Sequence, residues 1–455
     1  MTNEVQKVLV LTSRTGGGHD ARAEAFRDWV SKVYGSAVEV RIDHTLEDSS
    51  KWNRLGVELY NVIHRYNPFC HHIYYHIGEF FGLFQHRKVS VGLPYYDQLI
   101  REYQPDVIFS VHSMLNRGYF RHAKSCLTKP VFCVTYCGEF RGSYGFSRNW
   151  VARDVDLFLG RTQKTLEAAT NLGLPPGKGQ CWGHLLKPVF YEPPLGDRER
   201  EEYLQKELGL ELGRFTLLLA TGGAGAQNHE KLLRHVLSLQ ERIQVIALCG
   251  RNDKVRHALE LWQRAHPDFK IAVLPYSREM HRLLQVSSAV VTRPGTTTSA
   301  EALQLGCPIL FNRFGGTMPQ ESCTLRYFQA LDLAPHVLSP DDLEPRLRAW
   351  LDRPEDYERF RARFLAARTE DEPASLVRAI VAGRISERMA SNLSVDTGRV
   401  VLGTSGKHIA PDAGLADTPL KLAVPQCKEM TRSEEGMLQS AVGVSGERNW
   451  PGTDR

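Results

Sequence analysis

Short apolar segments rich in β-branched residues alternate along the chain with longer stretches in which apolar residues recur every three or four positions. The first pattern predicts buried strands and the second predicts amphipathic helices. Their regular alternation is typical of a parallel sheet with helices on both faces. In the first part of the chain we expect a helix at 20–34 and strands at 7–13, 37–43, 105–112, 130–136 and 155–160.

The same alternation starts again after "KPVFYEPPLGDRE" at 187–199, a segment rich in proline and charge that predicts a linker. Beyond it we expect strands within 214–226, 243–253, 269–276, 288–295 and 307–312. The stretch 341–388 has a helical pattern and is expected to close the second domain. The sequence thus predicts an α/β fold with domains at 1–190 and 196–388. The remaining residues, 390–455, show no persistent period and few aromatics, which indicates disorder.

Composition excludes some classes of function. A hydrophobic content of 42% and a charged content of 24% are typical of a globular protein. The net charge of +5 is too small to indicate a nucleic-acid partner, but it suits an anionic substrate or membrane surface. No apolar run is long enough to span a bilayer, and the first residues lack a signal-peptide pattern. The cysteines lie mostly in apolar runs without paired spacing, so we expect reduced thiols and no metal site.

The segment 52–100 interrupts the alternation with many aromatic residues and histidines, as in "HRYNPFCHHIYYHIGEFFGLFQHRK". Two interpretations stay open. The segment is a helical insertion packed on the first domain, or it is an amphipathic surface for a lipid interface, since aromatics mixed with basic residues suit the headgroup region.

A glycine loop, "LTSRTGGGHDARAEAF" at 11–26, follows the first strand. It is not a Walker A loop, because no Gly-Lys-Ser/Thr ends it. Gly16, Gly18 and Ala21 satisfy a dinucleotide-binding pattern, and Asp43 ends the next strand where a ribose-binding acid is expected. Alternatively His19 is the functional group. A helix N-terminus keeps its ring neutral, as a general base requires, although His19 could simply cap its helix.

Two further loops follow strands in the second half. In "ATGGAGAQN" (220–228), the amides of Gly222, Gly223 and Gly225 can wrap a diphosphate at a helix N-terminus, or the loop is a plain turn.

The more specific of these two loops lies in "VTRPGTTTSAEALQLGCPILFN" (291–312). Here helix amides and hydroxyl groups can bind phosphate oxygens, and Arg293 can add charge. Glu301 lies where a carboxylate can accept hydrogen bonds from ribose hydroxyls, or it only favours the helix dipole. Gln320 and Glu321 are candidates to meet the sugar hydroxyls. The phosphate-binding candidates are Arg293, Gly295, Thr296, Thr297 and Thr298.

Taken together, "TSRTGGGHDARAEAF", "RPGTTTSAEALQLGCPILFN" and "PQES" resemble the family of monogalactosyldiacylglycerol synthases and diacylglycerol glucosyltransferases. The family is related more distantly to the glycosyltransferase that makes lipid II. The resemblance implies a GT-B fold, in which two Rossmann-like domains face a cleft. It also implies inverting transfer of a hexose from a UDP-sugar to a lipid hydroxyl, with no metal and no other cofactor. The implied partners are the UDP-sugar donor, a lipid acceptor and, peripherally, the cytoplasmic face of the cell membrane.

The resemblance also assigns roles to residues. It implies His19 as the base, with Gly16, Gly17, Gly18 and His112 on the acceptor side. The loops at 222–226 and 295–299 face the diphosphate, and Glu301 faces the ribose. Arg14 stands where galactolipid synthases carry an acid, and Thr135-Tyr136 stands where the family has Thr-Asp. The acceptor is therefore left open.

Three other classes of function stay open. The chain could be a UDP-sugar epimerase or hydrolase on the same fold, or a dehydrogenase that binds NAD at its first glycine loop. It could also be a non-catalytic protein that binds a sugar nucleotide or a lipid.

Overall fold

The structure is a computed structural model that describes residues 6–66, 71–84, 92–220, 228–369 and 373–381. The expected disorder of 390–455 concerns residues outside these ranges. So does the predicted role of Gly222, Gly223 and Gly225.

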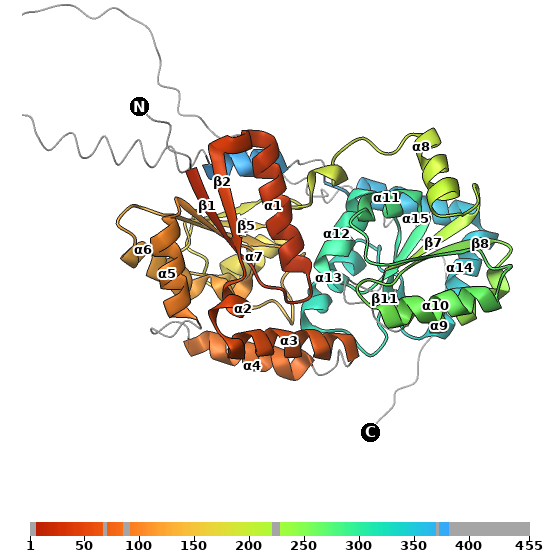
Figure 1. The fold of residues 1–455 in the computed structure, drawn as a ribbon, viewed down its shortest axis with the longest axis horizontal. Coiled ribbons are helices and arrows are strands. Elements are labelled where there is room, and N and C mark those ends of the chain that lie inside the picture. The colour runs from red at the N-terminus through yellow and green to blue at the C-terminus, as the bar shows by residue number, and fades with distance from the viewer. Residues whose placement is uncertain (1–5, 67–70, 85–91, 221–227, 370–372, 382–455) are drawn as a thin grey trace, which may run out of the picture. The chain divides into compact units, whose positions relative to one another are not determined.

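Two six-stranded sheets, all of whose strand pairs are parallel, form the framework of the described chain (Figure 1). The first sheet has the order β2-β1-β3-β4-β5-β6 and the second the order β12-β11-β10-β7-β8-β9. The predicted α/β fold is therefore confirmed. The strands of the first sheet are β1 (Gln6–Leu11), β2 (Val38–Asp43), β3 (Val107–Ser110), β4 (Phe132–Cys137), β5 (Leu157–Gly160) and β6 (Gly179–Cys181). Those of the second are β7 (Phe215–Ala220), β8 (Ile243–Leu248), β9 (Ile271–Leu274), β10 (Ala289–Thr292), β11 (Ile309–Asn312) and β12 (His336–Val337).

Both faces of the first sheet are buried, which explains its continuous apolar runs. Val8 and Val10 of β1 pack with Phe26 of α1, whereas Leu9 and Leu11 pack on the opposite face with Tyr96 of α5. This alternation follows from the period of two in a strand. The helices of the first half are α1 (Gly18–Tyr34), α2 (Thr45–Ser49), α3 (Lys51–Tyr66), α4 (His71–Phe84), α5 (Leu93–Tyr103), α6 (Arg117–Cys126) and α7 (Gln163–Asn171).

The second half repeats this layering around β7–β12. Its helices are α8 (Asp197–Glu202), α9 (His229–Val236), α10 (Asp253–Ala265), α11 (Met280–Val286), α12 (Thr296–Gln304), α13 (Pro319–Ala330), α14 (Leu343–Asp352) and α15 (Pro354–Ala366).

The final described helix, at 373–381, differs from the expectation that 341–388 closes the second domain. Its residues Leu376, Val377 and Ile380 share a hydrophobic cluster with Val8 and Phe26 of the first half. A periodic pattern shows that a helix has an apolar face, but it does not show which sheet that face covers.

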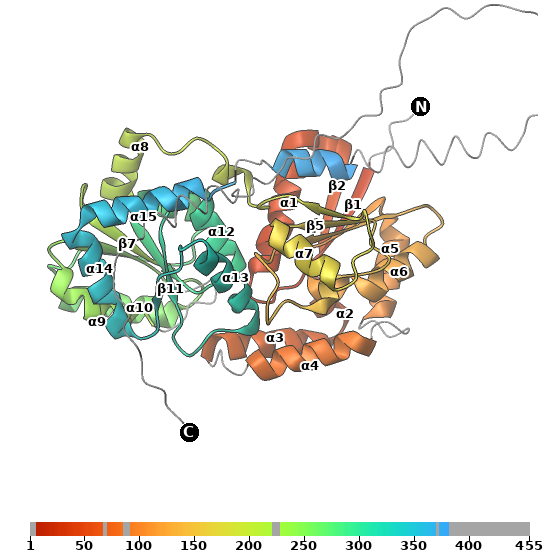
Figure 2. The same ribbon diagram turned by 180° about the vertical axis from the view of Figure 1, so that it is seen from behind.

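Helices α3 and α4 form the aromatic-rich insertion and lie side by side in both views (Figures 1 and 2). No helix among the described residues is both long and apolar enough to span a bilayer.

Candidate functional site

Two helix N-termini meet where the halves of the chain touch. Helix α1 follows β1 and helix α12 follows β10, and each has a glycine N-cap, Gly17 and Gly295, without a side-chain cap. The first amides of both helices are therefore open to an anion or a polar ligand. Gly17 has a φ of 77°, a left-handed conformation that favours glycine. The Thr297 hydroxyl donates to the carbonyl of Gly18 over 3.5 Å, so the two N-termini are in direct contact.

His19 stands in the first turn of α1 with a defined tautomer. Its Nδ1 lies 2.7 Å from the carbonyl oxygen of Val111. Because a carbonyl only accepts, Nδ1 carries the proton and Nε2 has the free lone pair. Burial, His112 and Arg22 hold the pKa of His19 well below its ordinary value. The ring is therefore a neutral base whose Nε2 receives no hydrogen bond from the described residues.

His112 is the second imidazole of the site, with its ring centroid 4.4 Å from that of His19. The Met114 N–H donates to its Nδ1 over 3.2 Å, so its Nε2 carries the proton and donates to the Thr15 hydroxyl over 3.2 Å. Burial and Arg22 lower the pKa of His112 to about 4. The structure thus places the predicted His112 beside His19 and next to the glycine loop.

The glycine loop is held from two sides. Asn61 of α3 accepts from the Gly16 N–H over 3.0 Å and donates to the Arg14 carbonyl over 3.1 Å. Glu47, which is buried, accepts from the Arg14 N–H over 2.5 Å and from the Ser13 hydroxyl over 3.0 Å. The backbone of Arg14 is thus anchored while the residue itself is exposed. Sequence reasoning missed Asn61 and Glu47, because both lie on helices distant in sequence from the loop.

Asp43, the residue proposed for a nucleotide ribose under the dinucleotide interpretation, is buried and engaged. It accepts from the Thr45 hydroxyl over 2.7 Å and from the Tyr95 hydroxyl over 2.9 Å. These contacts leave the dinucleotide interpretation without its acidic residue.

Glu301 lies on α12 at a cavity of about 30 Å³ lined also by Arg22, Arg161, Lys187 and Thr297. Burial raises the pKa of Glu301 to about 7, against the opposing influence of Lys187 and Arg161. Two acids were predicted on the donor side, Glu301 and Glu321. Only the carboxylate of Glu301 accepts no hydrogen bond from the described residues.

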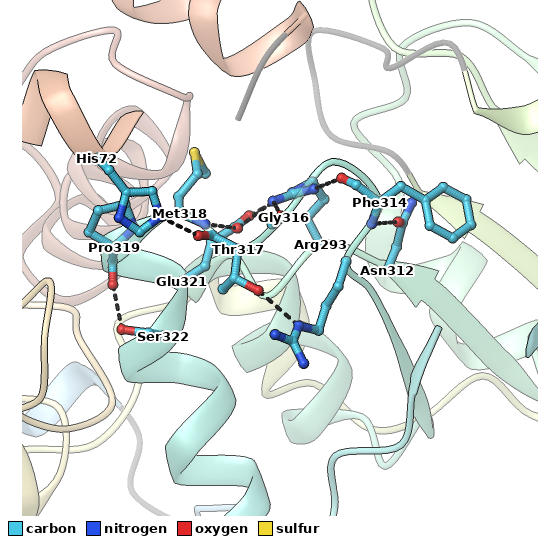
Figure 3. A network of polar contacts seen from close by, with 11 residues as sticks. His72, Arg293, Asn312, Phe314, Gly316, Thr317, Met318, Pro319, Glu321 and Ser322 are labelled. Carbon is cyan, nitrogen blue, oxygen red and sulfur yellow. Dashed lines mark hydrogen bonds and ion pairs between the residues drawn. The ribbon is translucent and has the colours of Figure 1, made fainter. Parts of the chain in front are cut away.

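Arg293 and Glu321, in contrast, are bound to each other (Figure 3). Arg293 donates to both carboxylate oxygens of Glu321 over 2.8 and 2.5 Å and to the carbonyls of Phe314 and Gly316 over 2.8 Å each. Glu321 also accepts from the Met318 N–H over 2.8 Å. This use differs from the predicted one. Their charges hold the 313–318 loop and begin α13, which leaves Arg293 little capacity for phosphate and Glu321 little for a sugar.

The other predicted donor-side residues lie near one another at the start of α12 and α13. Thr296, Thr297 and Thr298 form the first turn of α12 and are partly exposed. Gln320 lies in the first turn of α13, and its buried Oε1 has no hydrogen-bond partner in the described part of the chain.

Two buried arginines, which sequence reasoning missed, reach the start of α12 from the first half. Arg22 of α1 donates to the Thr296 hydroxyl, and Arg161, which follows β5, donates to the Thr296 carbonyl over 2.7 Å. A βαβ pattern shows where strands end, but it does not show that residues 139 positions apart converge on one threonine.

One group of described residues could offer three ligand atoms to a metal. Asp97, His122 and Cys126 lie on α5 and α6 with these atoms within 4.8 Å of one another. Their contacts join α5 to α6, and none of the three lines the cavity beside Glu301.

Two family models match the chain. The model described as monogalactosyldiacylglycerol (MGDG) synthase matches residues 19–183, and the glycosyltransferase family 28 C-terminal domain matches 216–313. The two matched ranges together cover more than half of the chain.

Individual relatives are more distant. The probable monogalactosyldiacylglycerol synthase of Nicotiana tabacum is 28% identical over 328 residues, which is 68% of this chain and 58% of that protein. The chain therefore spans less than two thirds of the length of that relative. The processive diacylglycerol beta-glucosyltransferase of Bacillus pumilus (strain SAFR-032) is 24% identical over 68% of this chain and 77% of its own.

Among solved structures, MurG of Acinetobacter baumannii superposes with a TM-score of 0.53 at 12% identity, over 83% of this chain and 99% of that one. At this identity the likeness concerns the fold alone. The MGDG synthase model thus matches most of the first parallel-sheet domain and the glycosyltransferase family 28 model matches much of the second, so the chain resembles both families in this order.

Proposed function

We propose that the protein is an inverting glycosyltransferase that moves a hexose from a UDP-sugar to the hydroxyl of a diacylglycerol-type lipid. The observation that carries the proposal is the geometry of His19. A neutral imidazole with a free Nε2 stands at the N-terminus of α1. This N-terminus contacts the open N-terminus of α12 through Gly18 and Thr297. The names of the plant and bacterial relatives, monogalactosyldiacylglycerol synthase and processive diacylglycerol beta-glucosyltransferase, support diacylglycerol as the acceptor.

The proposed reaction is a single displacement at the anomeric carbon. Nε2 of His19 takes the proton of the acceptor hydroxyl as its oxygen attacks the anomeric carbon. The bond between that carbon and the β-phosphate oxygen breaks, and its electron pair leaves with UDP. The open amides of α12 stabilise the diphosphate, and the ionised Glu301 accepts hydrogen bonds from the ribose.

Helices α3 and α4 give the proposal a lipid-facing surface. Trp52, Leu55 and Leu59 of α3 are more than half exposed, and so are Ile73 and Phe80 of α4. Their spacing of three, four or seven residues puts each set on one face of its helix.

The polar side of α4 faces the protein instead. His72 lies 3.0 Å from the Tyr144 hydroxyl and 3.1 Å from the Thr317 carbonyl, and Glu79 accepts from Arg148 over 3.2 Å. A surface helix normally buries its apolar side, so this inverted arrangement indicates a partner for the apolar face. A lipid surface suits that face, because the proposed acceptor is a lipid and Lys51 and Arg54 are exposed beside Trp52.

The test of the proposed function uses the full chain with a panel of UDP-hexoses and vesicles of diacylglycerol in anionic phospholipid. Mass analysis of the lipid fraction should show one added hexose. Free hexose or an epimerised UDP-sugar, formed equally without vesicles, would instead establish the hydrolase or epimerase. UDP binding without any transfer would establish a binding protein.

The membrane surface is tested by vesicle sedimentation of a Trp52→Ser, Ile73→Ser double variant. We expect a loss of vesicle binding, whereas Leu261→Ser, at an exposed leucine of α10, should bind as the unaltered protein does. Unchanged binding of the double variant would exclude this face as the lipid contact.

A further inference from the structure

Arg22 and Arg161 are among the most buried charged residues of the described chain, with exposed fractions of 2% and 1%. Removing a guanidinium from water is costly unless it is paired and fully hydrogen-bonded. Neither condition holds here. Nε of Arg22 and both Nε and Nη2 of Arg161 have no hydrogen-bond partner among the described residues.

The compensating charge near this pair is too small. Glu139, buried as well, opposes the two arginines, and its Oε2 has no partner in the described part of the chain. Burial raises the pKa of Glu139 although both arginines act to lower it. Burial and the neighbouring Arg161 lower the pKa of Arg22 to about 10. Glu301 and Lys187 line the adjoining cavity as well, so three cationic groups stand near two carboxylates, Glu139 and Glu301, and burial raises the pKa of both carboxylates. The cationic groups therefore outnumber the carboxylates here.

That excess lies where the donor diphosphate is proposed to bind. Both arginines hydrogen-bond Thr296, the first residue of α12, one at its hydroxyl and one at its carbonyl. The Nη1 atom of Arg22 also lies 3.2 Å from Nδ1 of His19. Because that nitrogen carries its proton, this contact is a close approach of two donors and not a hydrogen bond. Arg22 therefore bridges the proposed base and the N-terminus of α12.

The backbone leaves space for this arrangement. A Cβ atom on Gly138 would come within 2.3 Å of Nε of Arg22, so the guanidinium lies directly against the chain at the end of β4. The adjoining cavity of about 30 Å³, lined by both arginines, has room for one or two water molecules but not for a phosphate group. A phosphate at Thr296 must therefore replace the contact between Thr296 and Arg22 and become the partner of that guanidinium.

We infer that Arg22 and Arg161 form a binding site for the β-phosphate of the sugar nucleotide. The inference rests on the proposed function and deepens it. Guanidinium groups bind phosphate oxygens in pairs of hydrogen bonds, which would engage the N–H groups now without partners. As the anomeric carbon–oxygen bond breaks, the electron pair moves to the β-phosphate oxygen and the two guanidinium groups stabilise the added charge. Arg293, the arginine expected from sequence, is unsuited to this role because Glu321 occupies it.

The experiment compares the affinities of UDP, UMP and uridine by calorimetry, since only UDP has a β-phosphate. We expect the unaltered protein to prefer UDP over UMP by about tenfold or more, in line with two charge-assisted hydrogen bonds. Arg161→Met, which nearly keeps the side-chain volume, should lower UDP affinity about tenfold and leave UMP affinity within twofold. Arg22→Met should do the same and also slow transfer by about a hundredfold.

Arg121→Ala is the matched control, since this arginine of α6 is 57% exposed and pairs with Asp154. It should leave all three affinities unchanged. Should the methionine variants fail to fold, Arg22→Lys and Arg161→Lys keep the charge but lose paired hydrogen bonding. They should then reduce the preference for UDP over UMP.

Two outcomes separate this inference from the proposed function, because binding is measured without transfer. Equal losses of UDP and UMP affinity in the variants, or no preference for UDP in the unaltered protein, would overturn the inference even if lipid transfer occurs. A clear preference for UDP without transfer to any lipid would overturn the proposed function and leave the phosphate site in place.

Discussion

The N-termini of α1 and α12 share their backbone arrangement and differ in the side chains they carry. Each helix follows a strand in the interior of a parallel sheet and starts at an uncapped glycine. The two helices touch where Thr297 of α12 contacts Gly18 of α1. Helix α1 places a neutral imidazole in its first turn. Helix α12 places three threonines there and a carboxylate one turn later. The same open amides can thus serve an acceptor hydroxyl in one half and a diphosphate in the other.

The proposed base and the proposed anion site lie in opposite halves of the chain, although both helix ends would attract an anion. What separates them is charge. Arg22 and Arg161 both contact Thr296, the first residue of α12. Arg22 also approaches the protonated nitrogen of His19 and so helps to keep that ring neutral.

Removing the imidazole should have the largest effect. His19→Ala should lower the turnover number about a thousandfold, as expected for loss of a general base, and leave UDP affinity unchanged. His112→Asn serves as the comparison and should reduce turnover less, because both nitrogens of this ring are engaged, Nε2 with the Thr15 hydroxyl and Nδ1 with the Met114 N–H. Near-normal turnover of the alanine variant would exclude His19 as the base.

The pH profile tests the same residue without a mutation. Because burial lowers the pKa of His19, the ring should stay neutral well below pH 6.5. Turnover at saturating donor should therefore persist as the pH falls through that value and should decline only at lower pH. A decline centred at or above pH 6.5 would show that a different group limits the reaction.

The next effect concerns stability and separates the two kinds of arginine. Arg293→Met leaves the buried carboxylate of Glu321 without its partner, which should lower the free energy of unfolding by about 3 kcal/mol. Arg313→Met, in the same loop, removes a hydrogen bond to the Thr317 hydroxyl and should cost about 1 kcal/mol or less. Chemical denaturation measures both. If the Arg293→Met variant were as stable as the unaltered protein but bound UDP more weakly, Arg293 would bind phosphate as the sequence predicted.

Local sequence patterns predicted much of the fold and less of the site. The strands of both sheets were expected from apolar runs, apart from β6 and β12, which are three and two residues long. A strand of two or three residues has no period to detect. Glu301 and the threonines of α12 were expected because they are adjacent in sequence. The pairing of Arg293 with Glu321, and the convergence of Arg22 and Arg161, depend on loop conformations and domain contacts that no local pattern encodes.

Glu301 should produce a smaller effect with a distinct pH dependence. Its ionised form accepts stronger hydrogen bonds from the ribose hydroxyls than its protonated form does, and its pKa is about 7. Uridine, which has a ribose but no phosphate to titrate in this range, should therefore bind more tightly as the pH rises through 7. Glu301→Gln should lower uridine affinity about tenfold at pH 8 and remove the pH dependence. Glu230→Gln, at a partly exposed position of α9, is the control. If uridine affinity still depended on pH in the Glu301→Gln variant, a group other than Glu301 would be responsible for the pH dependence.

The smallest effect is expected at Asn61, which connects α3, the helix with the exposed apolar face, to the glycine loop. Asn61→Ala frees the Gly16 N–H and the Arg14 carbonyl, both near solvent, and should reduce turnover about threefold without changing UDP affinity. Asn53→Ala, on the same helix but bonded to Ser49, should leave turnover unchanged.

Helix α3 carries Trp52, Leu55 and Leu59 on its exposed face. If this face inserts into a bilayer, the position of Asn61 should become fixed, and with it the loop before His19. The Asn61→Ala defect should therefore be larger with diacylglycerol in vesicles than with a short-chain diacylglycerol in solution. Equal defects with both acceptors would show that the loop is positioned independently of the lipid surface.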